Sequence, residues 1–237
     1  MWCVAEITNE YRQRMYKLLA LYARPYDKNY PVVCVDEKSK QLIQDVRGVI
    51  PLKPGSPTKY DSEYLRKGTR NIFVAVEPLA GKRKIEVTLQ RKKSDFAYFI
   101  KELITQGYSH AKKIRSVLDN LNIHFAASFY ETFSKNEADR LLRKIEFHYT
   151  PKHGSWLNMA EIEINMMDRE CLNRRIGQGD LLQREIHCWA QERNKASKKI
   201  NWSFTRNKLT KNCLNTSHNT STSCSDTTMP TIPIFIF

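Results

Sequence analysis

Residues 31–46 read PVVCVDEKSKQLIQDV and begin with an apolar run that ends at an acid, Asp36. We interpret this stretch as two strands around a tight turn, because short runs of β-branched residues alternate with polar clusters. Asp36 then sits where a buried strand releases a polar side chain at its carboxyl end. Glu37 follows at once and would point to the opposite face of a strand, so Asp36 is the better candidate for a metal ligand.

A second apolar run, KIRSVLD, ends at Asp119 in the same way. Acids after strands also cap turns or bind nearby backbone N–H groups, so each acid taken alone fits a structural role equally well. Asn120 and His124 follow in the sequence DNLNIH, where their polar groups could orient the carboxylate or a substrate phosphate. His124 is equally compatible with a hydrogen-bonded histidine of the core.

A third acid, Glu161, lies just inside a predicted helix in the segment HYTPKHGSWLNMAEIE, residues 148–163. Polar residues recur there at helical spacing and line up on one face: Asn158, Glu161, Asn165 and Asp168. Taken alone, such a stripe is more typical of an ordinary solvated face. Glu163 lies about 200° around the helix from Glu161 and is the weaker candidate.

Three such carboxylates can build a two-metal site for phosphoryl transfer. Hard divalent cations prefer oxygen ligands, so Mg²⁺ or Mn²⁺ suits Asp36, Asp119 and Glu161 better than zinc does. The six cysteines are widely scattered without a CxxC pair, which argues against a zinc knuckle and against a disulfide framework. We therefore expect two Mg²⁺ or Mn²⁺ ions held by these three acids.

The charge balance indicates a polyanionic partner. Lys and Arg number 39 against 25 Asp and Glu, a formal charge of +14, which favours nucleic acid or an anionic membrane surface. No apolar run is long enough to span a bilayer and the first ten residues do not resemble a signal peptide, so we expect a cytoplasmic, DNA-binding protein. Most lysines in its basic runs also fit an ordinary solvated surface.

DNA contacts are expected near the proposed chemistry. Lys152 and His153 lie just ahead of Glu161 and could touch the scissile strand or simply shape the loop. With the polar residues around the acids, the predicted set of nucleic-acid contacts is Lys152, His153, Asn120, His124 and Asn158.

The order of predicted elements favours an α/β domain with a mixed sheet. Two strands, RNIFVAVEP and RKIEVTLQ, flank LAG as a hairpin, and KIRSVLD and KIEFHY supply further strands. A Pro- and Gly-rich surface excursion, VIPLKPGSPTKYDSEY, precedes the hairpin. Helices are expected at 6–23, at 94–106 with Ser94 as its cap, at 136–143, at 157–175 and at 179–199.

At the level of domains we expect a leading helix or linker over residues 1–25, a catalytic domain over 26–209 and a tail over 210–237. Half of the tail is Ser, Thr or Asn, and no helical period survives in it, so we expect it to be disordered.

The chain resembles the catalytic domain of bacterial insertion-sequence transposases related to mariner elements, the insertion-sequence 630 type. The segments that carry the resemblance are PVVCVDEKSKQLI, GTRNIFVAVEPLAG, RSVLDNLNIH and HYTPKHGSWLNMAEIE followed by INWSFT. The resemblance implies a ribonuclease H-like fold, a mixed five-stranded sheet with helices on both faces. It also implies an Asp, Asp, Glu catalytic triad, which falls on Asp36, Asp119 and Glu161.

This resemblance further implies metal-dependent cleavage at transposon ends and strand transfer into target DNA at a TA dinucleotide, by a homodimer associated with the bacterial nucleoid. Relatives usually carry a helix-turn-helix region ahead of the catalytic domain, whereas Met1 falls just before that domain here. We therefore expect a partial or frameshifted product. Two rival functions remain open, a ribonuclease H-like nuclease without strand transfer and an inactive DNA-binding transposase remnant.

Overall fold

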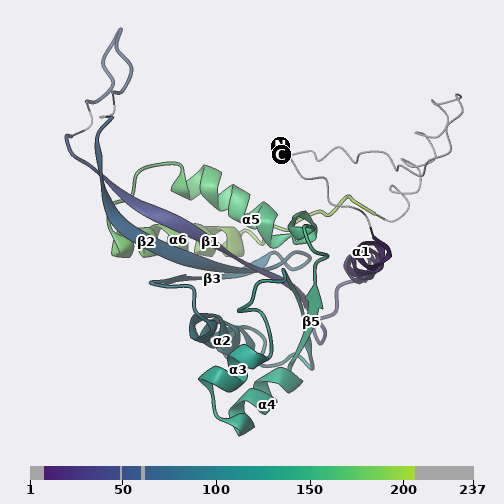
Figure 1. Cartoon of the computed structure of the whole chain (residues 1–237). Coiled ribbons are helices and arrows are strands. Elements are labelled where there is room, and N and C mark those ends of the chain that lie inside the picture. Colours follow the sequence, from purple (N-terminus) through teal and green to yellow (C-terminus); the bar gives the residue numbers. More distant parts are fainter. Residues whose placement is uncertain (1–7, 49, 60–61, 206–237) are drawn as a thin grey trace, which may run out of the picture.

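The computed structural model describes residues 8–48, 50–59 and 62–205, so the predicted tail at 210–237 lies outside the described residues (Figure 1). Within these ranges the chain forms a five-stranded sheet in the order β3-β2-β1-β4-β5. The strands are β1 (Val32–Asp45), β2 (Tyr64–Glu77), β3 (Lys82–Thr88), β4 (Ile114–Leu118) and β5 (Ile145–Tyr149). Strand β1 is antiparallel to β2 and parallel to β4, which confirms the predicted mixed sheet.

The first strand differs from its prediction. Residues 31–46 do not form two strands around a turn, because β1 runs unbroken for 14 residues beside β2, with one register irregularity between Gln41 and Ile43. Its polar second half is tolerated because this end of the sheet is partly exposed, while Val33 and Val35 in the first half are fully buried. Asp36 consequently lies within β1 and not at its end.

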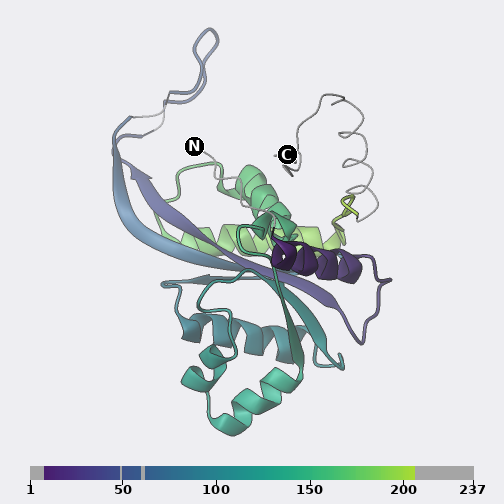
Figure 2. The same ribbon diagram turned by 45° about the vertical axis from the view of Figure 1, so that its right-hand side comes forward.

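Helices cover both faces of the sheet, as predicted (Figures 1 and 2). The helices on one face are α2 (Lys93–Glu102), α3 (Ala127–Thr132) and α4 (Lys135–Arg143), and those on the other are α5 (Ala160–Met167) and α6 (Gly179–Lys195). The described residues form three apolar clusters. Residues on opposite faces of β1 contribute to two of them, with Val33 and Val35 facing α2 and Leu42 facing α6. The third contains Cys34 and Val117, and a leading helix, α1 (Asn9–Tyr22), packs into it.

The helices also correct two details of the prediction. Ser94 does not cap α2, since the helix begins at Lys93 and the Asp95 carboxylate accepts the Lys92 N–H at 2.9 Å. The short helix α3 was missed because six residues are too few to show a helical period. Both α2 and α5 end in a π-helical turn, at Leu103–Gly107 and Asp168–Leu172.

The connection between β1 and β2 is the expected surface excursion. Its described parts, residues 46–48, 50–59 and 62–63, are mostly exposed and project beyond the sheet (Figures 1 and 2). None of the helices in the described ranges is long and apolar enough to cross a membrane.

A buried ion pair fastens α5 to the sheet and to α6. Glu163 on α5 and Arg83 on β3 are both fully buried, with Arg83 Nε 2.8 Å from Glu163 Oε1. Arg193 on α6 donates to the same carboxylate, with its Nε 2.9 Å from Oε1. Glu163 therefore serves the packing of α5, in agreement with its lower rank as a site residue.

The buried ion pair predicts a large loss of stability on removing one partner. Glu163→Gln leaves Arg83 buried without its carboxylate, so the free energy of unfolding should fall by about 3 to 5 kcal/mol in urea denaturation. The control is Glu131→Gln, which breaks the exposed pair of Glu131 with Lys93 and should cost about 1 kcal/mol or less. Equal losses in the two variants would contradict this role of Glu163.

Candidate active site

The parallel register of β1 and β4 sets two acids side by side. Cys34 pairs with Val117, so two residues further on Asp36 is level with Asp119, just past the end of β4. Neighbouring strands lie about 4.8 Å apart, which brings the two backbones close together. Because side chains alternate along a strand, Asp36 emerges on the face covered by α5, opposite to Val35.

Asp36 is only 6% exposed, and hydrogen bonds within the protein hold its carboxylate. Its Oδ1 accepts the Glu37 N–H at 2.8 Å, and its Oδ2 accepts Asn158 Nδ2 at 3.2 Å. Asn158 also donates to the Val35 carbonyl at 2.9 Å, and its own Oδ1 accepts the Ala160 N–H at 3.2 Å. This amide therefore joins the start of α5 to β1 at the position of Asp36.

Glu161 enters the site from the first turn of α5. Its N–H donates to the Asn158 carbonyl at 3.1 Å, so the same asparagine that binds Asp36 also starts the helix that carries Glu161. The side chain is half-buried. Burial raises the pKa of Glu161 and so does the negative charge of Asp119, whereas Lys38 lowers it.

Asp119 is bound to a buried histidine. Its Oδ1 lies 2.7 Å from His124 Nδ1 and accepts the Leu121 N–H at 3.1 Å. On the other side of the ring, His124 Nε2 lies 3.0 Å from Glu37 Oε2. Because both ring nitrogens face carboxylates, the imidazole is best satisfied with both nitrogens protonated.

The pKa shifts in this cluster follow from the same contacts. Burial alone would lower the pKa of His124, but the contacts with Asp119 and Glu37 raise it to about 9. Burial would raise the pKa of Asp119, yet the hydrogen bond and charge of His124 lower it overall. Asp119 is thus kept as a carboxylate.

Asp36 has the opposite shift. Burial, together with the negative charges of Glu161, Glu37 and Asp119, raises the pKa of Asp36 to about 8. The three acids therefore repel one another in a partly desolvated place, and a divalent cation would relieve that repulsion. The all-oxygen donor set also fits Mg²⁺ or Mn²⁺. In the described part of the chain no three metal-binding side chains are already close enough to hold an ion, so the acids would have to converge on it.

Lys38 supplies a positive charge beside the acids. It lies two residues after Asp36 on the same face of β1 and forms an ion pair with Asp168, in the π-helical turn that follows α5. Sequence reasoning placed Glu37 on the opposite face from Asp36 and ranked it as the weaker ligand, but it gave neither Glu37 nor Lys38 a role in the site. The two-residue alternation along a strand identifies both as neighbours of Asp36.

The predicted DNA contacts divide into exposed and buried residues. Lys152, His153 and Asn120 are exposed, although the Asn120 amide already donates to the Thr150 carbonyl at 2.7 Å. His124 and Asn158 are fully buried and hydrogen-bonded to the acids, so the prediction that they touch DNA is wrong for this arrangement. Their polar groups contact Asp119 and Asp36 inside the protein instead.

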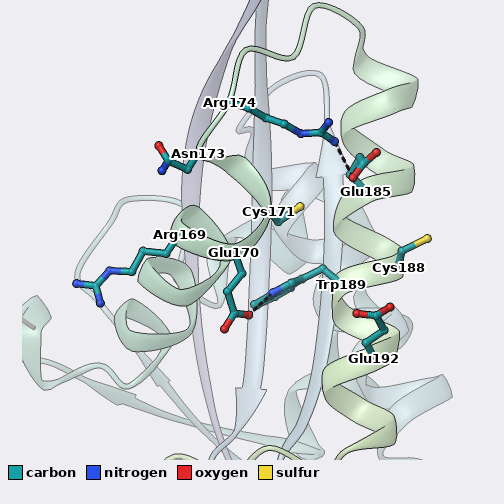
Figure 3. Close-up of a pocket in the computed structure, with 9 residues that line it drawn as sticks. All are labelled: Arg169, Glu170, Cys171, Asn173, Arg174, Glu185, Cys188, Trp189 and Glu192. Atoms are coloured by element: carbon teal, nitrogen blue, oxygen red, sulfur yellow. Dashed lines mark hydrogen bonds and ion pairs between the residues drawn. The ribbon is translucent and has the colours of Figure 1, made fainter. Parts of the chain in front are cut away.

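A pocket of about 500 Å³ lies elsewhere, between the turn after α5 and helix α6 (Figure 3). None of the three acids lines it. Two pairs of its polar side chains bind each other, with Arg174 2.7 Å from Glu185 and Trp189 Nε1 donating to Glu170 at 2.6 Å. The acid cluster is therefore the better candidate for chemistry.

Comparisons with known proteins agree on the fold. The structure resembles that of the "Mos1 mariner paired end complex with Mn", with a TM-score of 0.51 and 14% sequence identity over 84% of this chain and 61% of that one. The "mariner Mos1 paired end complex with Mg" matches with a TM-score of 0.48 and 13% identity, over 85% of this chain and 66% of the other. The first likeness confirms the predicted ribonuclease H-like fold. No curated protein matches.

The chain spans less than two thirds of the length of either Mos1 chain. A family described as "DDE superfamily endonuclease" matches residues 31–183. That range contains β1 to β5, α5 and all three acids. Since the match covers more than half of the sequence, this protein belongs to the DDE superfamily endonuclease family.

Proposed function

We propose that this chain is the catalytic part of a DNA transposase related to mariner elements, of the insertion-sequence 630 type, and that it cuts and joins DNA with a divalent metal. The observation that carries the proposal is the burial and electrostatic repulsion among Asp36 on β1, Asp119 after β4 and Glu161 on α5, which together raise the pKa of Asp36 to about 8. Repulsion that raises the pKa of a buried acid is typical of a site at which a cation binds.

In the proposed reaction Asp36 and Asp119 hold two Mg²⁺ or Mn²⁺ ions, and Glu161 completes the set of ligands. Such a pair of ions supplies Lewis-acid activation of the attacking oxygen and stabilises the leaving oxygen. Asn158 keeps the Asp36 carboxylate in place through its hydrogen bond at 3.2 Å. The resemblance to the family and the donor set support the two ions.

The proposed substrate is DNA, namely the transposon ends and a target with the dinucleotide TA. The formal charge of +14 supports a polyanionic substrate, and Lys152 and His153 are exposed in the loop ahead of Glu161. The related Mos1 structure with a TM-score of 0.51 is a paired-end complex by its title. Pairing of two ends supports a homodimer, and DNA as the substrate supports action at the nucleoid in the cytoplasm.

Neutralising any one of the three acids should abolish catalysis. Asp36→Asn, Asp119→Asn and Glu161→Gln should each reduce metal-dependent cleavage by at least about 100-fold, because each removes a carboxylate that binds a charged reaction centre. The measurement is Mg²⁺- and Mn²⁺-dependent nicking of DNA that contains the element's ends. Asp139→Asn on α4 is the matched control and should keep full activity. Undiminished cleavage by Asp119→Asn would refute the assignment.

Strand joining separates transposition from its rivals. A transposase should convert cut ends into joined products with target DNA, whereas a nuclease without strand transfer should yield cut ends only. Salt-sensitive DNA binding without any metal-dependent cleavage would identify a DNA-binding remnant. The assay follows radiolabelled ends on denaturing gels, with the chain joined to an end-recognition region.

Lys152 should contribute one phosphate contact. Lys152→Ala should weaken DNA binding and reduce the slope of log affinity against log salt by about 0.9. Lys135→Ala on α4, on the far face of the sheet, is the control and should leave the slope unchanged. Equal slopes in wild type and Lys152→Ala would remove this lysine from the DNA path.

Asp36 should make the metal-free protein less stable as pH rises. Its folded pKa of about 8 lies above its ordinary value of 3.8, so the folded state binds the extra proton between these values. The contribution of protonated Asp36 to the free energy of unfolding is complete below about pH 4 and is lost as pH rises through about 8. The melting temperature should fall between pH 5 and about pH 8, less steeply in Asp36→Asn, and Mg²⁺ should reverse the trend in wild type. An identical pH slope in Asp36→Asn would contradict this assignment.

A further inference from the structure

We propose that His124 and Glu37 are positioning residues that fix the Asp119 carboxylate for metal binding. The inference rests on the proposed function, since it gives Asp119 a metal to bind. Glu37 lies on β1, Asp119 follows β4, and His124 contacts both, at 3.0 Å and 2.7 Å. The three side chains form a bridge between two neighbouring strands.

Asp119 needs such a support because it lies beyond the last residue of β4, Leu118. No ladder of backbone hydrogen bonds holds it there. Its Oδ1 is bound twice, by His124 Nδ1 and by the Leu121 N–H at 3.1 Å. Among the described residues Oδ2 has no hydrogen bond from the protein, so one oxygen is fixed and the other remains available to a ligand.

His124 can fix a carboxylate because its own ring is held on several sides. It is fully buried, and its ring centroid lies 4.8 Å from that of Phe96 on α2. Its backbone is fixed as well, since the Tyr149 hydroxyl donates to its carbonyl at 2.7 Å and its N–H donates to the Leu121 carbonyl at 3.0 Å. A ring packed in this way cannot turn away from Asp119 without opening the core.

Glu37 completes the bridge from the other side. Its side chain is only 3% exposed, and a buried carboxylate is costly unless it is paired. Its partners are His124 and Arg91, the latter 3.2 Å from Oε1. Glu37 directly follows Asp36 but points to the opposite face of the sheet. The backbone of β1 therefore carries one proposed ligand and also the support of another.

Two substitutions of His124 separate positioning from packing. Asn places its amide nitrogen near the position of Nδ1 and so keeps a donor for Asp119, whereas Gln reaches the position of Nε2 and loses that donor. If His124 acts through Asp119, His124→Gln should weaken Mn²⁺ binding by about 10- to 100-fold, as is usual for residues that orient a ligand. His124→Asn should bind Mn²⁺ more tightly than His124→Gln. Titration calorimetry of the full chain measures both without any DNA.

The matched control is His148 on β5, which pairs with Glu146 at 3.1 Å and is partly buried. His148→Gln and His148→Asn should both bind Mn²⁺ as wild type does. Thermal melts without metal show whether any loss follows from unfolding. If His124→Gln does not fold, Glu37→Gln replaces it, and a loss of Mn²⁺ affinity with Glu146→Gln unaffected supports the bridge.

The outcomes distinguish this inference from the proposed function. If Asp119→Asn weakens Mn²⁺ binding but His124→Gln and Glu37→Gln bind like wild type, the bridge is purely structural and the inference is overturned. Equal losses in His124→Asn and His124→Gln also overturn it. If Asp119→Asn itself leaves Mn²⁺ affinity unchanged, the proposed metal site is wrong.

Discussion

Electrostatic repulsion among buried acids is the constraint on which this structure depends. Asp36 is nearly inaccessible to water and lies within the influence of Glu161, Glu37 and Asp119, so its pKa rises to about 8. A core that only had to be stable would not collect such charges. The fold holds the acids together in two ways. The parallel register of β1 and β4 sets Asp36 beside Asp119, and the hydrogen bond of Asn158 to the Val35 carbonyl fixes the start of α5 beside them.

The rest of the domain keeps these elements in position. Helix α5 carries Glu161 toward the acids and, two residues later, Glu163 into the buried pair with Arg83. Since Arg193 on α6 binds the same carboxylate, the helix is tied to the sheet and to its neighbour helix. On the opposite face α2 contributes Phe96, which packs against the histidine beside Asp119. Both layers of helices therefore help to position the cluster of acids.

Apolar runs and helical periods are local signals, and they were sufficient to predict the mixed sheet and to single out the three acids as candidates. The helices on both faces and the catalytic triad were implied by the resemblance to the transposase family. The continuation of β1 past Asp36 was not predictable, because the pairing of DEKSKQL with β2 is a long-range contact. Burial also depends on long-range contacts, so the sequence left open whether His124 orients a carboxylate, touches DNA or belongs to the core. In the structure His124 binds Asp119 and Asn158 binds Asp36. The catalytic roles themselves remain proposals.

The central claim is that Asp36, Asp119 and Glu161 together bind divalent metal, and anomalous diffraction from crystals soaked in Mn²⁺ tests it most directly. Manganese peaks should appear between these three side chains, with the two aspartates as ligands and Asn158 still bound to Asp36. Peaks confined to other places, such as the pocket lined by Glu170, Glu185 and Glu192, would contradict the account. So would the absence of any peak at a Mn²⁺ concentration that supports cleavage.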